Sequence, residues 1–169
     1  IVLAALLLLL SQLTLGSMGQ YIFPNYFGSK EGVSISGFCA NILVIVLAFI
    51  VPTLAAKVGK KELSAFGGIL GAVVFFIAFI LHTDNLYLFI ALYTIGYLGI
   101  GFFNVNCWAM ITDVIDDAEV REGERSDGTF YSVYSFARKM GQAASSGLTG
   151  ALLGIVGYTE ATAFDPDVL

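Results

Sequence analysis

Residues 86–111 read LYLFIALYTIGYLGIGFFNVNCWAMI, a stretch without a charged side chain. About 20 helical residues, rising 1.5 Å each, cross a hydrocarbon layer that is about 30 Å thick. Backbone groups in lipid must bond within the protein, and a continuous apolar run does this as a helix rather than as an alternating barrel strand. Runs of this kind predict five membrane-spanning helices, at about 1–27, 33–56, 65–82, 86–111 and 128–158.

The composition supports an all-α membrane protein. Of the 169 residues, 57% are apolar and 12% are charged, whereas about 25% are charged in a typical soluble domain. The net charge of −5 includes only eight basic residues, which excludes a surface for binding nucleic acid. Cys39 and Cys107 lie far apart in apolar runs and form neither a disulfide framework nor a metal-binding pair. An ordinary soluble enzyme and a disordered chain are disfavoured as well.

The charged residues mark the expected connections between the helices. Loops at 57–64 and 112–127 fall on one side of the membrane and hold five basic residues, while the other side holds only Lys30. The positive-inside rule therefore places these two loops in the cytoplasm. The chain starts within an apolar run and ends in a polar, acidic tail at 159–169, so we expect an internal fragment of a longer membrane protein.

A polar stripe distinguishes the last predicted helix. At 100° per residue, its members fall within an arc of about 100°: Ser132, Ser135, Lys139, Gln142, Ser146 and Thr149. Such a stripe in an apolar bundle suits a water-filled cavity. Two interpretations of Lys139 remain open. If the helix begins near Met140, Lys139 reaches the cytoplasmic surface; if it begins near Gly128, Lys139 lies about 16 Å deep, near the midplane.

Small and polar residues give weaker indications. The Gly67–Gly71 and Gly150–Gly154 pairs have the GxxxG spacing of closely packed membrane helices. Trp108 suits an interfacial anchor or an aromatic surface on which a sugar stacks. No metalloprotease, nucleophile-elbow or phosphate-loop motif occurs, so the sequence does not predict an enzyme.

The segment from Asn104 to Tyr158 resembles the glycoside–pentoside–hexuronide:cation symporter family of the major facilitator superfamily. The matching residues are Asp113-Val-Ile-Asp116-Asp117-Ala-Glu119, Gly123-Glu-Arg125, Gly128-Thr-Phe-Tyr-Ser132, Lys139-Met-Gly141 and Gly157-Tyr158. Asp117 departs from the family pattern, which commonly has tyrosine there. The segment 56–61 is similar to the basic loop of facilitators but lacks its usual Asp-Arg pair.

The resemblance implies that the five helices are helices seven to eleven of twelve, in a multi-pass protein of a bacterial cytoplasmic membrane. It implies sugar transport coupled to Na+ or H+, with no other cofactor and with the cation bound mainly by the missing amino-terminal half. The expected partners are the sugar, the cation, the bilayer and that missing half. The substrate-binding residues would be Lys139, Ser135, Tyr134, Gln142 and Asn104. A cytoplasmic gate network would comprise Asp113, Asp116, Glu119, Arg125 and Arg138.

Two alternative functions remain. Related facilitators carry lysophospholipids, and an amphipathic cavity with a fixed cation also suits a zwitterionic headgroup. A membrane scaffold that transports nothing would instead keep the polar stripe packed and dry.

Overall fold

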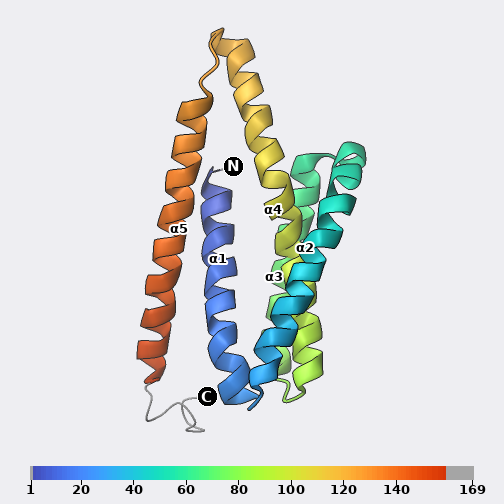
Figure 1. Cartoon of the computed structure of the whole chain (residues 1–169), viewed down its shortest axis with the longest axis vertical. Coiled ribbons are helices and arrows are strands. Elements are labelled where there is room, and N and C mark those ends of the chain that lie inside the picture. Colours follow the sequence, from blue (N-terminus) through green and yellow to red (C-terminus); the bar gives the residue numbers. More distant parts are fainter. Residues whose placement is uncertain (1, 159–169) are drawn as a thin grey trace.

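The computed structural model describes residues 2–158, which form five α-helices and one short π-helix (Figure 1). The elements are α1 (Val2–Tyr21), η1 (Ile22–Tyr26), α2 (Lys30–Val58), α3 (Lys60–Leu81), α4 (Leu86–Glu122) and α5 (Asp127–Val156). The expected all-α fold with five helices is confirmed. Within residues 2–158 no strand occurs, and the predicted acidic tail at 159–169 lies outside the described residues.

Four of the helices are long and apolar enough to cross a membrane. They are α1 with η1, α2, α3 and α4, with 25, 29, 22 and 37 residues. Their outward-facing side chains are largely apolar and exposed, as lipid contact requires; Phe38, Phe49 and Phe79 are examples. Helix α5 has 30 residues but is less apolar, because the polar stripe occupies part of its surface. For α5, a membrane-spanning role stays a prediction.

Two expected loops are mostly helical, and this corrects the predicted boundaries. In 57–64, only Gly59 separates α2 from α3, and its φ of 106° favours glycine. In 112–127, α4 continues to Glu122, and the turn at 123–126 begins with Gly123 at φ 75°. The reason is that Lys, Glu and Arg are good helix formers, so a helix that leaves the hydrocarbon need not end there. We call the end of the bundle with these two turns the charged end.

Helices α2, α3 and α4 form one closely packed group. The expected Gly67–Gly71 motif lies against α4, where a Cβ built on Gly67 would be 2.5 Å from the carbonyl oxygen of Gly99. On the other side of α4, Gly101 faces Leu47 of α2, which is almost completely buried. The Gly150–Gly154 motif differs, since a Cβ built on either glycine would have no atom of another described helix within 4 Å. It does not pack any helix in this part of the chain.

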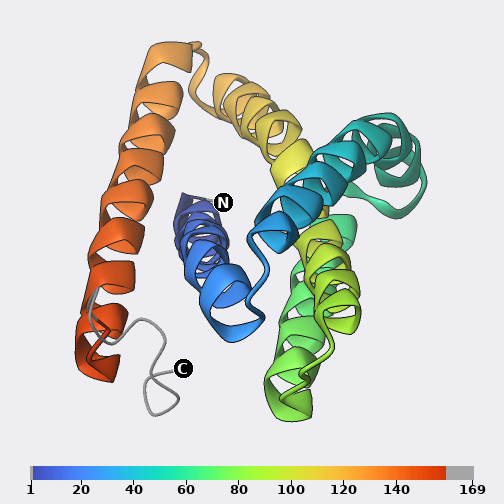
Figure 2. The ribbon, with the colours of Figure 1, turned by 60° about the horizontal axis from the view of Figure 1, so that its bottom comes forward.

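Helix α1 lies between α5 and the α2–α3–α4 group in both views of the ribbon (Figures 1 and 2). It meets α5 closely at Gly141, where an added Cβ would lie 3.3 Å from the Leu6 carbonyl oxygen. Near the charged end, a buried cluster joins α1, α4 and α5: Ala5, Phe103, Cys107, Ile111, Ile115 and Tyr134. Helices α4 and α5 project beyond the others at this end (Figure 1).

The close approach of α3 to α4 predicts that even one added methyl group at Gly67 destabilises the protein. We expect Gly67→Ala in the full-length protein to lower the free energy of unfolding by about 1–3 kcal/mol, the usual cost of overpacking. The measurement is a melting curve of the detergent-purified protein. Gly68→Ala is the matched control, because nothing lies within 4 Å of its added Cβ. Equal melting temperatures for the two variants would contradict the packing described.

Candidate substrate site and charge network

Helix α5 is continuous through the polar stripe. It begins at Asp127 rather than near Met140, so of the two expected interpretations the longer helix is the one observed. Its level in the bundle follows from Ser145, which accepts a hydrogen bond from Thr14 in the middle of α1 at 3.2 Å. Lys139 precedes Ser145 by six residues, or about 9 Å of helix. Lys139 therefore lies nearer the charged end than the Thr14–Ser145 contact, and its position near the midplane stays a prediction.

The stripe itself is largely uncovered by the described residues. Ser132, Ser135, Lys139 and Ser146 are exposed, Gln142 is half-buried, and only Thr149 is buried. The Lys139 ammonium donates a hydrogen bond to Gln142 Oε1 at 3.0 Å. Within residues 2–158, Lys139 has no carboxylate within ion-pair distance. Its charge is thus unbalanced in this part of the chain.

Next to this stripe, α5 meets α4 through aromatic rings and a cation. We call Trp108, Tyr131, Tyr134 and Arg138 the Trp108 cluster. The Arg138 guanidinium carbon lies 5.4 Å from the centre of the Trp108 ring and 5.7 Å from that of Tyr134. The Trp108 ring is edge-on to Tyr134 at 5.1 Å and tilted against Tyr131 at 6.2 Å. Cation–π contacts of this kind contribute about 0.5–2 kcal/mol each.

The structure places two expected substrate residues in helix contacts. Tyr134 is 3% exposed, and its hydroxyl shares a hydrogen bond of 3.2 Å with Cys107 Sγ. Its ring therefore packs between helices instead of lining open space. Asn104 donates from Nδ2 to Gln12 Oε1 at 2.7 Å, which links α4 to α1. Among the described residues, no hydrogen bond joins Asn104 or Tyr134 to Lys139.

The expected gate network separates into two groups. Arg125 holds the α4–α5 turn together through Asp116, Glu119 and Asp127, at 3.0, 2.7 and 3.0 Å. These carboxylates accept hydrogen bonds from the guanidinium and raise the pKa of Arg125 above its ordinary value, so it stays charged at any physiological pH. Separately, Asp113 pairs with Lys60 at 2.7 Å and joins α4 to the start of α3. These pairs are largely exposed.

Arg138 makes no ion pair with that network among residues 2–158. Its guanidinium has no carboxylate within 4 Å in this part of the chain and lies instead over the rings of Trp108 and Tyr134. Sequence reasoning missed two members of the network, Lys60 and Asp127. Both are charged residues near helix ends, but their pairing depends on how the helices are placed in space. No group of three metal-ligating side chains occurs within residues 2–158.

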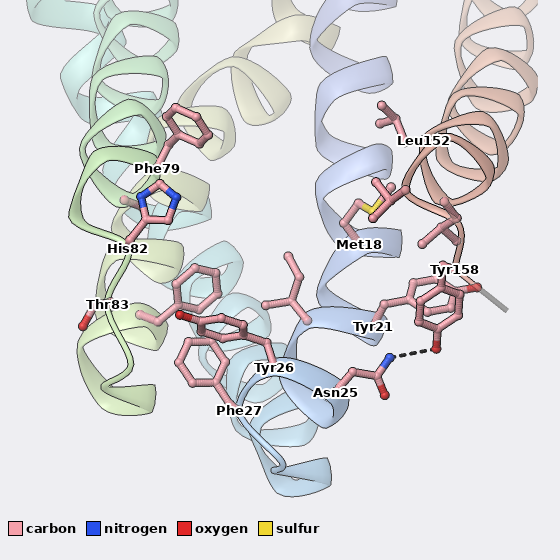
Figure 3. Close-up of a pocket in the computed structure, with 15 residues that line it drawn as sticks. Met18, Tyr21, Asn25, Tyr26, Phe27, Phe79, His82, Thr83, Leu152 and Tyr158 are labelled. Carbon is pink, nitrogen blue, oxygen red and sulfur yellow. Dashed lines mark hydrogen bonds between the residues drawn. The ribbon is translucent and has the colours of Figure 1, made fainter. Parts of the chain in front are cut away.

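The opposite end of the bundle holds a pocket of about 400 Å³ (Figure 3). It lies between the ends of α1, α3 and α5, and aromatic rings form much of its lining. Asn25 donates to the Tyr158 hydroxyl at 2.7 Å, and Tyr21 stands edge-on to the same ring at 5.2 Å. Most of the lining is apolar. The pocket therefore lies at the other end of the helices from Lys139 and the Trp108 cluster.

Comparison with known proteins gives one family. Residues 1–169 match the family described as "MFS/sugar transport protein". The "Uncharacterized symporter YjmB" of Bacillus subtilis is 36% identical over 70% of this chain and 26% of its own length. The "Putative sulfoquinovose importer" of Salmonella typhimurium is 32% identical over 72% of this chain, and the "Glucuronide carrier protein homolog" of Escherichia coli 30% over 74%, covering 26% and 27% of those proteins.

The chain spans about a quarter of the length of these curated relatives. No solved structure matches it. Its relatives are membrane transporters and not enzymes, in agreement with the apolar helices and with a multi-pass membrane protein. The match over all 169 residues shows that the chain belongs to the MFS/sugar transport protein family.

Proposed function

We propose that the full-length protein is a secondary transporter that carries a sugar-type substrate together with Na+ or H+. The observation that carries this proposal is the exposed polar stripe of α5, in which Lys139 bonds only to the Gln142 amide and has no carboxylate beside it among the described residues. An uncompensated cation on a membrane helix is costly unless it faces water or a partner. A cavity shared with the rest of the protein supplies both.

The names of the relatives support a sugar as the substrate. Two of them are named for sulfoquinovose and for glucuronides, and a third is named a symporter. In the proposed cavity, Ser135 and Gln142 offer hydrogen bonds to hydroxyl groups, while the exposed Trp108 offers an apolar ring face. Asn104 contributes through Gln12, which it holds in place on α1.

Transport by this fold requires the two halves of the protein to move against each other, so that the site opens to each side in turn. The described residues supply the parts of such a device at the charged end. The Arg125 contacts link the two sides of the α4–α5 turn, and the Lys60–Asp113 pair links α4 to α3. We infer that the charged end is cytoplasmic and closes against the missing half.

The proposal predicts that Lys139→Ala in the full-length protein abolishes cation-coupled sugar uptake without reducing the amount of protein in the membrane. The reason is that the variant removes the positive charge that a substrate or a carboxylate of the missing half would pair with. Uptake into proteoliposomes under an imposed Na+ or H+ gradient measures it. Lys30→Ala is the matched control, since Lys30 is an exposed lysine at the opposite end of the bundle. Normal uptake by Lys139→Ala would reject this role for the residue.

Further competition experiments separate the alternatives. Inhibition of uptake by lysophospholipids but not by sugars would favour a lipid substrate. A scaffold predicts that a cysteine at Ser135 stays unlabelled by a water-soluble thiol reagent.

The charge network predicts a second result. We expect Arg125→Gln to loosen the α4–α5 turn and to favour the state that is open at the charged end. Because exposed ion pairs are individually weak, the labelling rate of a Ser135→Cys variant from that side should rise about two- to tenfold. Labelling is measured above the background of the protein without Ser135→Cys.

Arg121→Gln is the control for this experiment. Arg121 pairs only with Asp117, one turn away on the same helix, at 3.0 Å. Its loss should leave the labelling rate unchanged. If Ser135→Cys is labelled at the same rate with and without Arg125→Gln, the α4–α5 turn does not influence opening at the charged end.

A further inference from the structure

Two adjacent cations on α5 lack an anionic partner. The cations at the charged end are balanced where the network forms: Lys60 pairs with Asp113, Arg121 with Asp117, and Arg125 with three carboxylates. Arg138 and Lys139 lie deeper in the bundle, yet neither has a carboxylate within 4 Å among residues 2–158. The low-dielectric surroundings of a membrane protein make two neighbouring positive charges costly unless an anion joins them.

Arg138 is also held in a fixed orientation. Its guanidinium lies over the rings of Trp108 and Tyr134, and Tyr134 is in turn fixed by its bond to Cys107. A guanidinium contacts rings through its face, whereas its N–H donors point outward in its plane. A guanidinium carries five N–H donors, so donors remain for an anion beside those directed at the Tyr134 hydroxyl. A preorganised donor edge of this kind matches the two oxygen atoms of a carboxylate or sulfonate.

Around this edge, the structure offers the other groups that a sugar requires. Trp108 is 48% exposed, so part of its ring is available for apolar contact. On the neighbouring face of α5, Lys139 and the half-buried Gln142 supply donors and acceptors for hydroxyl groups. An anionic group and a polyhydroxylated ring are thus both matched within about two turns of one helix.

We propose that Arg138 is a specificity-determining residue that binds the acidic group of an anionic sugar, a sugar carboxylate or sulfonate. This inference rests on the proposed transport function and narrows its substrate class. It reassigns Arg138 from the gate network to the substrate. Lys139 adds charge beside it, while the Trp108 cluster sets the direction of the guanidinium.

The test uses the purified full-length protein and matched sugar pairs: D-glucuronate and D-glucose, D-galacturonate and D-galactose, and glucose 6-sulfonate with glucose. Binding is measured by calorimetry and by ligand-induced thermal stabilisation. We expect at least one acid to bind more tightly than its neutral counterpart. Arg138→Gln should lower the affinity for that acid by about 10- to 100-fold, which is the contribution of a charge-assisted bidentate contact. It should leave the affinity for the neutral sugar unchanged.

Two further variants keep the result interpretable. Arg138→Lys retains the charge but not the planar donor edge, so its affinity for the acid should lie between those of the unaltered protein and Arg138→Gln. This variant also tests the proposal if Arg138→Gln fails to fold. Arg121→Gln removes an arginine outside the site and should preserve the preference. An acid preference that is unchanged in both Arg138 variants would overturn the proposal.

Other outcomes also decide it. Arg138 would pair with a carboxylate elsewhere in the full-length chain if Arg138→Gln lowered the thermal stability of the ligand-free protein and weakened the binding of acids and neutral sugars equally. That result would contradict the proposal. Stabilisation by phosphatidylglycerol with no preference among sugars, or the absence of binding by every acid, contradicts it too. Cation-coupled uptake of neutral sugars without acid preference would reject this inference alone. Acid binding that depends on Arg138 but without uptake would reject only the transport function.

Discussion

Polar contacts of Gln12 and a buried apolar cluster join the two parts of this bundle. The Gln12 backbone carbonyl accepts a hydrogen bond from the Tyr97 hydroxyl at 3.0 Å, and its side chain accepts one from Asn104 at 2.7 Å. Hydrogen bonds between membrane helices contribute about 0.6 kcal/mol on average, so these two bonds add to the buried cluster around Ala5 and Tyr134 rather than replace it. The α1–α5 pair therefore meets the α2–α3–α4 group through both polar and apolar contacts. Such an arrangement suits a protein whose helices must shift without separating.

The spacing of charged residues was sufficient to predict the number and type of the helices, because the cost of placing charge in hydrocarbon is large and local. It was insufficient to predict where the helices end. The acidic segment after Asp113 was expected to be a loop, yet it continues α4 to Glu122, since outside lipid a charged sequence is compatible with a helix. The glycines with positive φ, Gly59 and Gly123, mark the actual turns. The two GxxxG motifs also differ in the structure: Gly67–Gly71 packs against α4, whereas Gly150–Gly154 packs against no helix of the described residues. The motif predicts a surface for close packing but does not identify the helix that packs on it.

The candidate site shows the same limit. The Lys139–Gln142 contact follows from a separation of three residues on one helix, so helical geometry alone brings those side chains together. Trp108 and Cys107, which contact Arg138 and Tyr134 from α4, lie about 30 residues earlier in the chain, so these contacts depend on how α4 and α5 are aligned. The resemblance to a family supplied the transport hypothesis. It could not show that Arg138 lies against aromatic rings rather than carboxylates.

Because α4 is long, a small tilt of this helix at Trp108 would displace its charged tip by a large distance. From Trp108 to Glu122 the helix runs 14 residues, or about 21 Å, whereas Asp113 lies only about 7 Å from the same point. If α4 tilts by about 10° around Trp108, its tip swings by about 4 Å while the Lys60–Asp113 pair moves by about 1 Å. The same tilt would therefore move the tip of α4 further than it moves the Lys60–Asp113 pair, which lies close to Trp108 along the helix.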